Sequence, residues 1–138
     1  MKRAVVVSDG RLQVDAVLGA LAAAGFDAVE VENVNRVRSD LEAGAAAVVL
    51  GYAGHSNEPS HLAALTSLPP GLRRACVVVL VGPGLATGDG TRAFHLGVDL
   101  VVAWHDTPRL GELIDSAVAF KRILVAPLDP AAATRLGG

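Results

Sequence analysis

Few residues of this chain combine the types and the spacing that catalysis requires. In open α/β sheets the chemistry lies just beyond the carboxyl ends of the strands, so the residues that follow each apolar run are the first candidates. Only Asp9 among them carries a carboxylate, and it also suits a cap for the helix expected after it. A single acid is too few for Mg²⁺, which needs several oxygen ligands. The residues that follow the runs are Ser8, Asp9, Gly51, Tyr52, Gly82, Trp104 and His105.

The remaining reactive side chains do not assemble into a recognisable centre. The histidines are separated by loops and lack the i, i+4 spacing of a zinc pair, which favours surface histidines. The serines lie in turn or cap positions, where a hydroxyl usually bonds the backbone. Cys76 lies within an apolar run, which predicts a buried and inert thiol. We therefore expect no catalysis, no metal site and no cofactor. The histidines and serines considered are His55, His61, His95, His105, Ser8, Ser56 and Ser60.

A glycine-rich loop runs from Gly82 to Gly90 and is the strongest competing signal. Glycines between a strand and a helix can aim backbone N–H groups at a phosphate, which makes Gly82, Gly84, Gly88 and Gly90 a candidate anion loop. The loop follows the fourth strand rather than the first, and it lacks both phosphate-binding fingerprints. A mobile interaction loop is the favoured interpretation. A small flavodoxin-like protein that binds a nucleotide or an anion here is the alternative.

The spacing of apolar residues predicts five strands that alternate with five helices. The composition agrees, because a chain that is 51% hydrophobic but only 4% aromatic has the Val, Leu and Ala of a parallel sheet covered by helices. Right-handed crossovers then place helices on both faces of the sheet. The expected strands cover 4–7, 27–32, 46–52, 75–81 and 100–104, and the expected helices cover 14–24, 35–43, 62–68, 91–96 and 110–124.

The charge and hydropathy of the chain exclude several partner classes. A net charge of -2 argues against a general nucleic-acid binder, which needs a surplus of Lys and Arg. No apolar run approaches the roughly 20 residues that cross a bilayer, and no signal-peptide pattern follows Met1. We expect a soluble cytoplasmic protein that binds neither nucleic acid nor membrane.

The pattern over residues 2–124 resembles the receiver domain of bacterial response regulators. The match is strongest in AVVVSDG and in the stretch Gly97-Val98-Asp99-Leu100-Val101-Val102-Ala103-Trp104-His105. The resemblance implies a flavodoxin-like (βα)5 fold, a doubly wound parallel sheet in three layers with strand order 2-1-3-4-5. It also implies a role in two-component signal transduction. The family transfers a phosphoryl group to an aspartate, which requires a nucleophilic carboxylate, acids for Mg²⁺, a hydroxyl and an ammonium.

Most of these functional positions are changed in this chain. The paired acids of the family fall on Ser8 and Asp9, and the phosphoacceptor falls on Gly51, which has no side chain. The hydroxyl falls on Val81, or on Gly82 if the register shifts by one. The lysine falls on Trp104, the proline after it on His105, and the switch aromatic on Val101. The resemblance therefore implies a pseudo-receiver that cannot be phosphorylated, with a domain over residues 1–125 and a flexible tail over 126–138.

A protein-binding face is the remaining functional prediction. Trp and Arg are enriched in interface anchors, and the fourth helix, fifth strand and fifth helix bring several such residues together. The family uses this face for dimerisation and output. We therefore expect phosphorylation-independent binding of a protein partner of unknown identity, with a homodimer as the candidate assembly. The expected face comprises Arg92, Phe94, His95, Trp104, His105 and Arg109.

Overall fold

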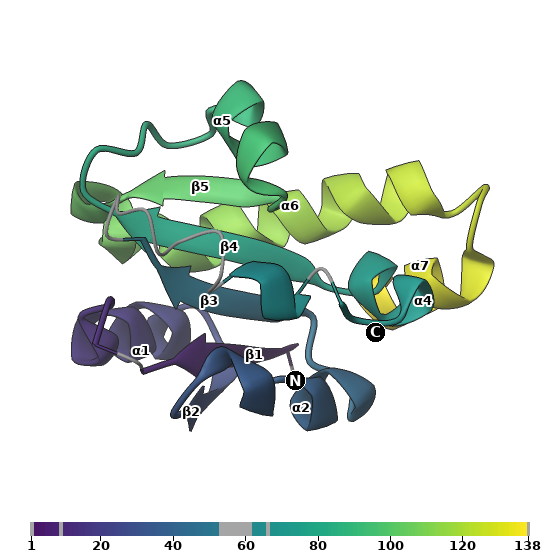
Figure 1. Cartoon of the computed structure of the whole chain (residues 1–138), viewed down its shortest axis with the longest axis horizontal. Coiled ribbons are helices and arrows are strands. Elements are labelled where there is room, and N and C mark those ends of the chain that lie inside the picture. Colours follow the sequence, from purple (N-terminus) through teal and green to yellow (C-terminus); the bar gives the residue numbers. More distant parts are fainter. Residues whose placement is uncertain (1, 9, 53–61, 66, 138) are drawn as a thin grey trace.

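A single parallel sheet forms the centre of the computed structural model, which describes residues 2–8, 10–52, 62–65 and 67–137. Its strands are β1 (Lys2–Val7), β2 (Phe26–Val31), β3 (Ala47–Gly51), β4 (Val77–Gly82) and β5 (Leu100–Ala103). They run in the order β2-β1-β3-β4-β5, and every pair is parallel. The predicted flavodoxin-like fold and strand order are therefore confirmed (Figure 1).

Helices cover both faces of the sheet because the central strands carry apolar side chains on both of their faces. On one face, Val6, Val49 and Val79 pack against α1 (Val14–Ala23) and α6 (Leu110–Val125). On the other face, Val48 and Leu80 pack against three shorter helices and the side chains of Leu62, Leu65 and Leu68. Those helices are α2 (Arg38–Glu42), α4 (Pro70–Arg74) and α5 (Gly90–Leu96). The central strands are buried on both faces, as parallel sheets require.

Three local elements differ from the prediction. The helix expected over 35–43 divides into a 3-10 turn, η1 (Val34–Arg36), and α2. Residues 69–71, expected only to break a helix, instead begin α4, since Pro70 suits a first helical turn where its missing N–H costs nothing. A second 3-10 segment, η2 (Trp104–Arg109), separates β5 from α6. The strand order and the crossovers are unchanged by these differences.

The C-terminal residues form a packed helix where a flexible tail was expected. Helix α7 (Pro130–Gly137) folds back beside α4 and α6 (Figure 1) and buries Ala132, Ala133 and Leu136 against Ala75 and Val125. Asp129 caps the helix, because its carboxylate accepts the N–H of Ala132 at 3.1 Å, and it pairs with Arg74 at 2.9 Å. The prediction failed because α7 is short and rich in alanine, and its stability comes from this packing rather than from its own sequence.

Within the described part of the chain, no helix has the length and the apolar character needed to cross a membrane. The same residues contain no cluster of three or more His, Cys, Asp or Glu side chains that could hold a metal ion.

Candidate functional site

The tip of β3, where receivers carry their phosphoacceptor, is closed by backbone. Gly51 is buried, and a Cβ atom at this position would overlap the carbonyl group of Arg11 and lie 2.8 Å from the Arg11 Cβ. Arg11 belongs to the loop between β1 and α1, so this loop lies directly on the end of β3. Gly51 therefore lacks an acceptor group and also leaves no room for one.

A second glycine closes the neighbouring strand in the same way. A Cβ at Gly82, the last residue of β4, would overlap the carbonyl oxygen of Tyr52. The Tyr52 N–H donates to the carbonyl of Val81 at 2.9 Å, and its hydroxyl accepts from Arg92 Nη2 at 2.7 Å. The tyrosine ring is buried and the Arg92 guanidinium lies 5.5 Å from its centroid. Tyr52 therefore fills the edge between β3 and β4.

The other changed positions have structural partners of their own. The Ser8 hydroxyl donates to the carbonyl of Val31 at 3.0 Å, in agreement with a serine that bonds the backbone. Val81 is fully buried, and so is Val101. Trp104 begins η2 and packs toward the face covered by α1 and α6. The residues Asp9, His55, Ser56, Ser60 and His61 lie outside the described residues.

The glycine-rich loop is anchored along β5. The Gly88 N–H donates to the carbonyl of Val101 at 3.0 Å. Thr87 Oγ1 donates to Asp106 at 2.5 Å and accepts the N–H of Ala103 at 2.8 Å. Asp89 caps α5 by accepting the N–H of Arg92 at 3.1 Å. Two carboxylates, those of Asp89 and Asp106, thus lie at the loop that is the candidate anion site, and their negative charge opposes the binding of a phosphate there.

A shallow apolar groove lies between α5 and α6. Its volume is about 450 Å³, and its walls include Phe94 of α5 with Phe120 and Leu124 of α6. These three side chains are 82%, 64% and 56% exposed. Asp99 and Lys121 contribute the charged part of the lining. The binding face predicted from the sequence did not include Phe120 or Leu124.

The structure divides the six residues of the expected binding face among different surroundings. Phe94 lines the groove, and its ring lies 6.2 Å from that of His95, whereas Arg92 turns toward Tyr52. Trp104 and His105 line a separate hollow with α1, and Arg109 pairs with Glu112 at 2.8 Å. Of these six residues, only Phe94 therefore lines the α5/α6 groove.

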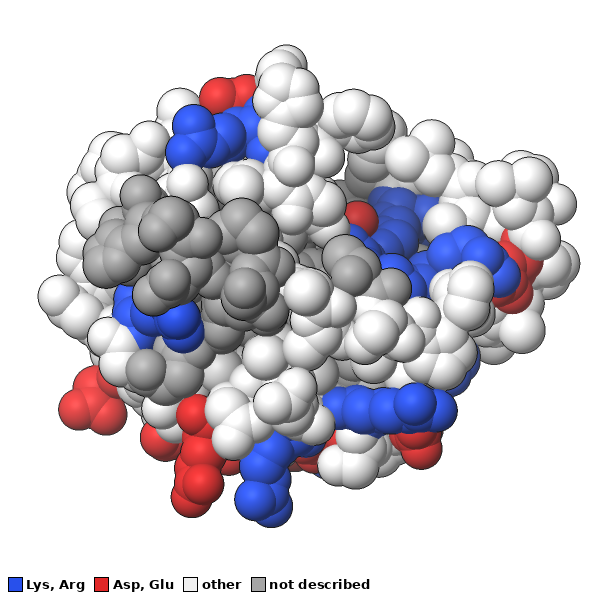
Figure 2. Space-filling view, viewed as in Figure 1, with Lys and Arg blue, Asp and Glu red and all other residues white. Residues whose placement is uncertain are grey.

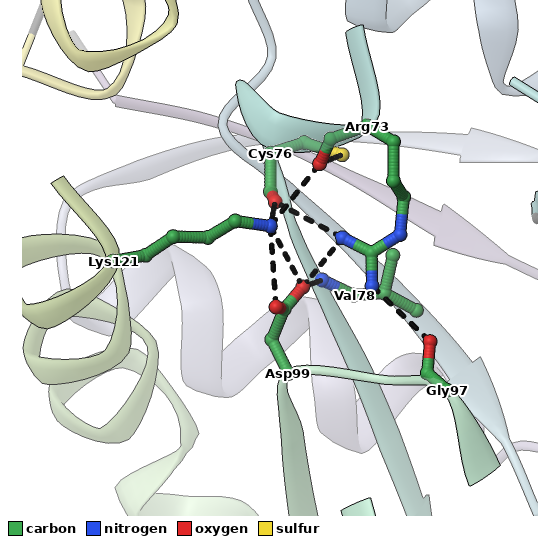
Figure 3. A network of polar contacts seen from close by, with 6 residues as sticks. All are labelled: Arg73, Cys76, Val78, Gly97, Asp99 and Lys121. Atoms are coloured by element: carbon green, nitrogen blue, oxygen red, sulfur yellow. Dashed lines mark hydrogen bonds and ion pairs between the residues drawn. The ribbon is translucent and has the colours of Figure 1, made fainter. Parts of the chain in front are cut away.

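A compact network of charges lies at the other end of the sheet, where β4 and β5 begin (Figure 3). Asp99 accepts from Arg73 Nη1 at 2.7 Å, from Lys121 Nζ at 3.1 Å and from the Val78 N–H at 2.8 Å. Lys121 also donates to the carbonyl of Cys76 at 2.6 Å. Figure 2 shows charged atoms at the base of a recess where α4, α5 and α6 meet. The network joins α4, α6 and two strands.

Burial governs the electrostatics of this network. The side chains of Arg73, Asp99 and Lys121 are only 22%, 23% and 14% exposed. Burial lowers the pKa of Lys121, and the carboxylate of Asp99 opposes that shift. Burial also raises the pKa of the Cys76 thiol, against the influence of the neighbouring Arg73 and Lys121 cations. The prediction of a buried cysteine is therefore confirmed.

Sequence reasoning did not find this network, since its members lie far apart in the chain. The only available signal was Lys121, which occupies a place in the apolar stripe of α6 where a charged residue needs a partner. The sequence alone does not say which acid supplies that partner.

Comparison with known proteins supports the fold. No protein-family model matches the sequence, and no curated protein matches it. Among solved structures, the chain is similar to a response regulator from Hahella chejuensis, with a TM-score of 0.52 and 14% sequence identity. The match covers 88% of this chain and 92% of that chain. At this identity the similarity shows a shared fold.

Proposed function

We propose that this chain is a receiver-like signalling module that acts by binding protein, without accepting a phosphoryl group. The observation that carries the proposal is the closed tip of β3, where Gly51 lies against the Arg11 carbonyl group. Phosphoryl transfer to an aspartate needs a carboxylate at that tip and open space in front of it for the phosphate and its Mg²⁺. This strand end has neither.

The neighbouring positions support the same conclusion. Val81 offers no hydroxyl and is fully buried. Trp104 replaces the ammonium group that would bind a phosphoryl oxygen, and its ring packs toward α1 and α6. A signal that reached this domain would therefore have to act through contact with another protein.

The partner that we propose is a second copy of the chain, bound through the α5/α6 groove. The exposed parts of Phe94, Phe120 and Leu124 present on the order of 400 Å² of apolar surface, taking about 200 Å² for a whole aromatic side chain. A standard interface contributes about 800 Å² from each partner. The groove side chains would thus supply about half of what a stable dimer needs.

Charge also favours a second copy over a charged peptide. Lys121 and Asp99, the charged residues of the groove, are already paired with each other at 3.1 Å. An occupant consequently needs apolar side chains rather than a complementary charge. The same surface carries both protruding aromatic rings and a groove, so two copies related by a two-fold axis can exchange them.

The absence of phosphorylation is tested with small phosphodonors. We expect no mass gain after incubation with acetyl phosphate and Mg²⁺, and no change in Trp104 fluorescence with beryllofluoride and Mg²⁺. A gain of one phosphoryl group, or an Mg²⁺-dependent change in fluorescence, would contradict the proposal.

The dimer is tested by light scattering coupled to size-exclusion chromatography. Phe120→Ser should shift the protein toward monomer, because it removes an aromatic ring from the groove. Ile123→Ser is the matched control, since Ile123 lies on the same helix and is 68% exposed but does not line the groove. A monomeric wild type, or equal effects of both substitutions, would refute the dimer while leaving the phosphorylation result unaffected.

A further inference from the structure

A small cavity lies at the amino edge of the sheet, that is, at the amino-terminal ends of its strands, where α7 meets β1 and α6. Its volume is about 170 Å³, and Phe26 and Val118 supply apolar parts of its wall. The charged residues around it are Lys2, Arg3, Arg135 and Asp115. Three cations and one acid therefore line a cavity in a protein whose net charge is -2.

Lys2 and Asp115 largely cancel each other. The Lys2 ammonium lies 2.9 Å from the Asp115 carboxylate, and it also donates to the carbonyl of Ala24 at 3.2 Å. The same ammonium lies 4.6 Å from the centre of the Phe26 ring. Two guanidinium groups, those of Arg3 and Arg135, remain without an acid among the residues that line the cavity.

These guanidinium groups use few of their donors. Arg135 binds the carbonyls of Leu41 and Glu42 at 2.6 and 3.3 Å, both through Nη2. Arg3 reaches the Ala43 carbonyl through Nη1 at 3.4 Å, and its Nε lies 3.9 Å from an exposed carboxylate, that of Asp27. Among the described residues, Nε and Nη1 of Arg135 and Nη2 of Arg3 have no partner. A guanidinium carries five N–H donors in a planar fork that suits oxyanions.

We propose that this cavity binds a small tetrahedral oxyanion, with the chemistry of a phosphate group, between Arg3 and Arg135. The anion offsets the electrostatic repulsion between two cations that line one cavity. It also accepts hydrogen bonds from guanidinium N–H groups that the carbonyl groups leave without a partner. The volume accommodates the oxyanion itself. Because Arg3 belongs to β1 and Arg135 to α7, the bound anion also fastens α7 to the sheet. This site is independent of the α5/α6 groove.

Isothermal titration calorimetry of the full chain at constant ionic strength tests the site. One arm uses inorganic phosphate and the other uses glycerol 3-phosphate, so the two sources of the same group are compared. Binding of either probe supports the site, and a preference for the ester shows that the mouth admits the attached group. Absence of binding heat with both probes overturns the proposal.

Substitutions then locate the binding. Arg3→Gln and Arg135→Gln should each weaken the binding about tenfold or more, since each removes charge-assisted hydrogen bonds. Arg135→Gln also removes bonds that hold α7 against α2, whereas Arg3→Gln leaves those bonds in place and keeps the test valid if α7 loosens. Arg109→Gln is the control, because it makes the same change in net charge at η2, at the opposite edge of the sheet. Unchanged affinity in Arg3→Gln, or an equal loss in Arg109→Gln, contradicts the proposed site.

Discussion

The two ends of the parallel strands, here called the amino edge and the carboxyl edge of the sheet, are closed by different means. At the carboxyl edge, backbone rests on backbone, because Gly51 and Gly82 lack the Cβ atoms that would collide with Arg11 and Tyr52. At the amino edge, cationic side chains bind carbonyl groups at the ends of helices. In this fold the helices run against the strands, so their negative C-terminal ends gather at the amino edge.

Four helices receive such a cation from a different element. The carbonyl groups at a helix C-terminus have no hydrogen-bond partner within the helix, so a donor from another element satisfies them. A positively charged donor also interacts favourably with the negative end of the helix dipole. The contacts are Lys2 to the C-cap residue Ala24 of α1, Arg135 to Leu41 of α2, Lys121 to Arg73 of α4, and Arg73 to the C-cap residue Gly97 of α5.

The charged residues of this chain are placed differently from those of receivers. Receivers place their acids and their lysine at the carboxyl edge, where they act on phosphate. Here the described ion pairs in which both side chains are largely buried, those of Asp99 with Lys121 and Arg73, are at the amino edge and bind elements to one another. Charge at this edge stabilises the fold.

Removing the central acid of the amino edge should have the largest effect on stability. Asp99→Asn keeps the shape of the side chain but leaves Arg73 and Lys121 as buried cations without an anion. Breaking a buried ion pair in this way costs about 3 kcal/mol of unfolding free energy, at the low end of the usual range because each side chain keeps some contact with water. Urea denaturation measures the change.

An exposed pair provides the control for that measurement. Glu42→Gln breaks the pair with Arg38 at 2.7 Å, in which both side chains are more than half exposed. The expected loss is below about 0.5 kcal/mol. Equal effects of Asp99→Asn and Glu42→Gln would show that the amino-edge network does not stabilise the fold.

Adding one methyl group at the carboxyl edge should have the second largest effect. Gly51→Ala forces the loop at Arg11 away from β3, and overpacking of this kind costs about 2 kcal/mol. Gly71→Ala is the control, since nothing lies near its added Cβ and alanine favours the helix α4. Denaturation of both variants distinguishes them. A neutral Gly51→Ala would mean that the tip of β3 is open and would weaken the case against phosphorylation.

The fold could be predicted from the sequence because its signals are local. Runs such as residues 46–52 and 75–81 show apolar β-branched residues bounded by glycine or charge, and helices between them repeat at helical spacing. The topology then follows from short right-handed crossovers. Gly51 and Cys76 could also be located, since each lies within such a run.

The site could be predicted only as a set of missing groups. That Gly51 lacks a carboxylate is visible in the sequence, but its contact with the Arg11 backbone depends on how a distant loop packs. The partners of Lys121 depend on residues 22 and 48 positions away in the chain. Helix α7 was missed for a related reason, because its stability comes from Ala75 and Val125 rather than from its own sequence.

The smallest effect should appear at the Cys76 thiol, which lies beside the amino-edge network and contributes to the pH dependence of stability. Burial raises the folded pKa of this thiol above its ordinary value of 9.0. Above that pH the unfolded chain loses the thiol proton first and so binds fewer protons than the folded chain. The thiol therefore contributes stability that is present below pH 9.0 and is lost as the pH rises toward the folded pKa.

Cys76→Ala removes this contribution and leaves Lys121 in place. The difference in unfolding free energy between the wild type and Cys76→Ala should therefore shrink as the pH rises through 9.0. Urea denaturation of both proteins across this range measures it, and the titration of Lys121, which the two proteins share, largely cancels in the difference. A difference that stays constant would place the thiol in contact with water and would contradict a closed amino edge. A difference that shrinks would show that the same packing which holds Lys121 against Asp99 also excludes water from the sulfur.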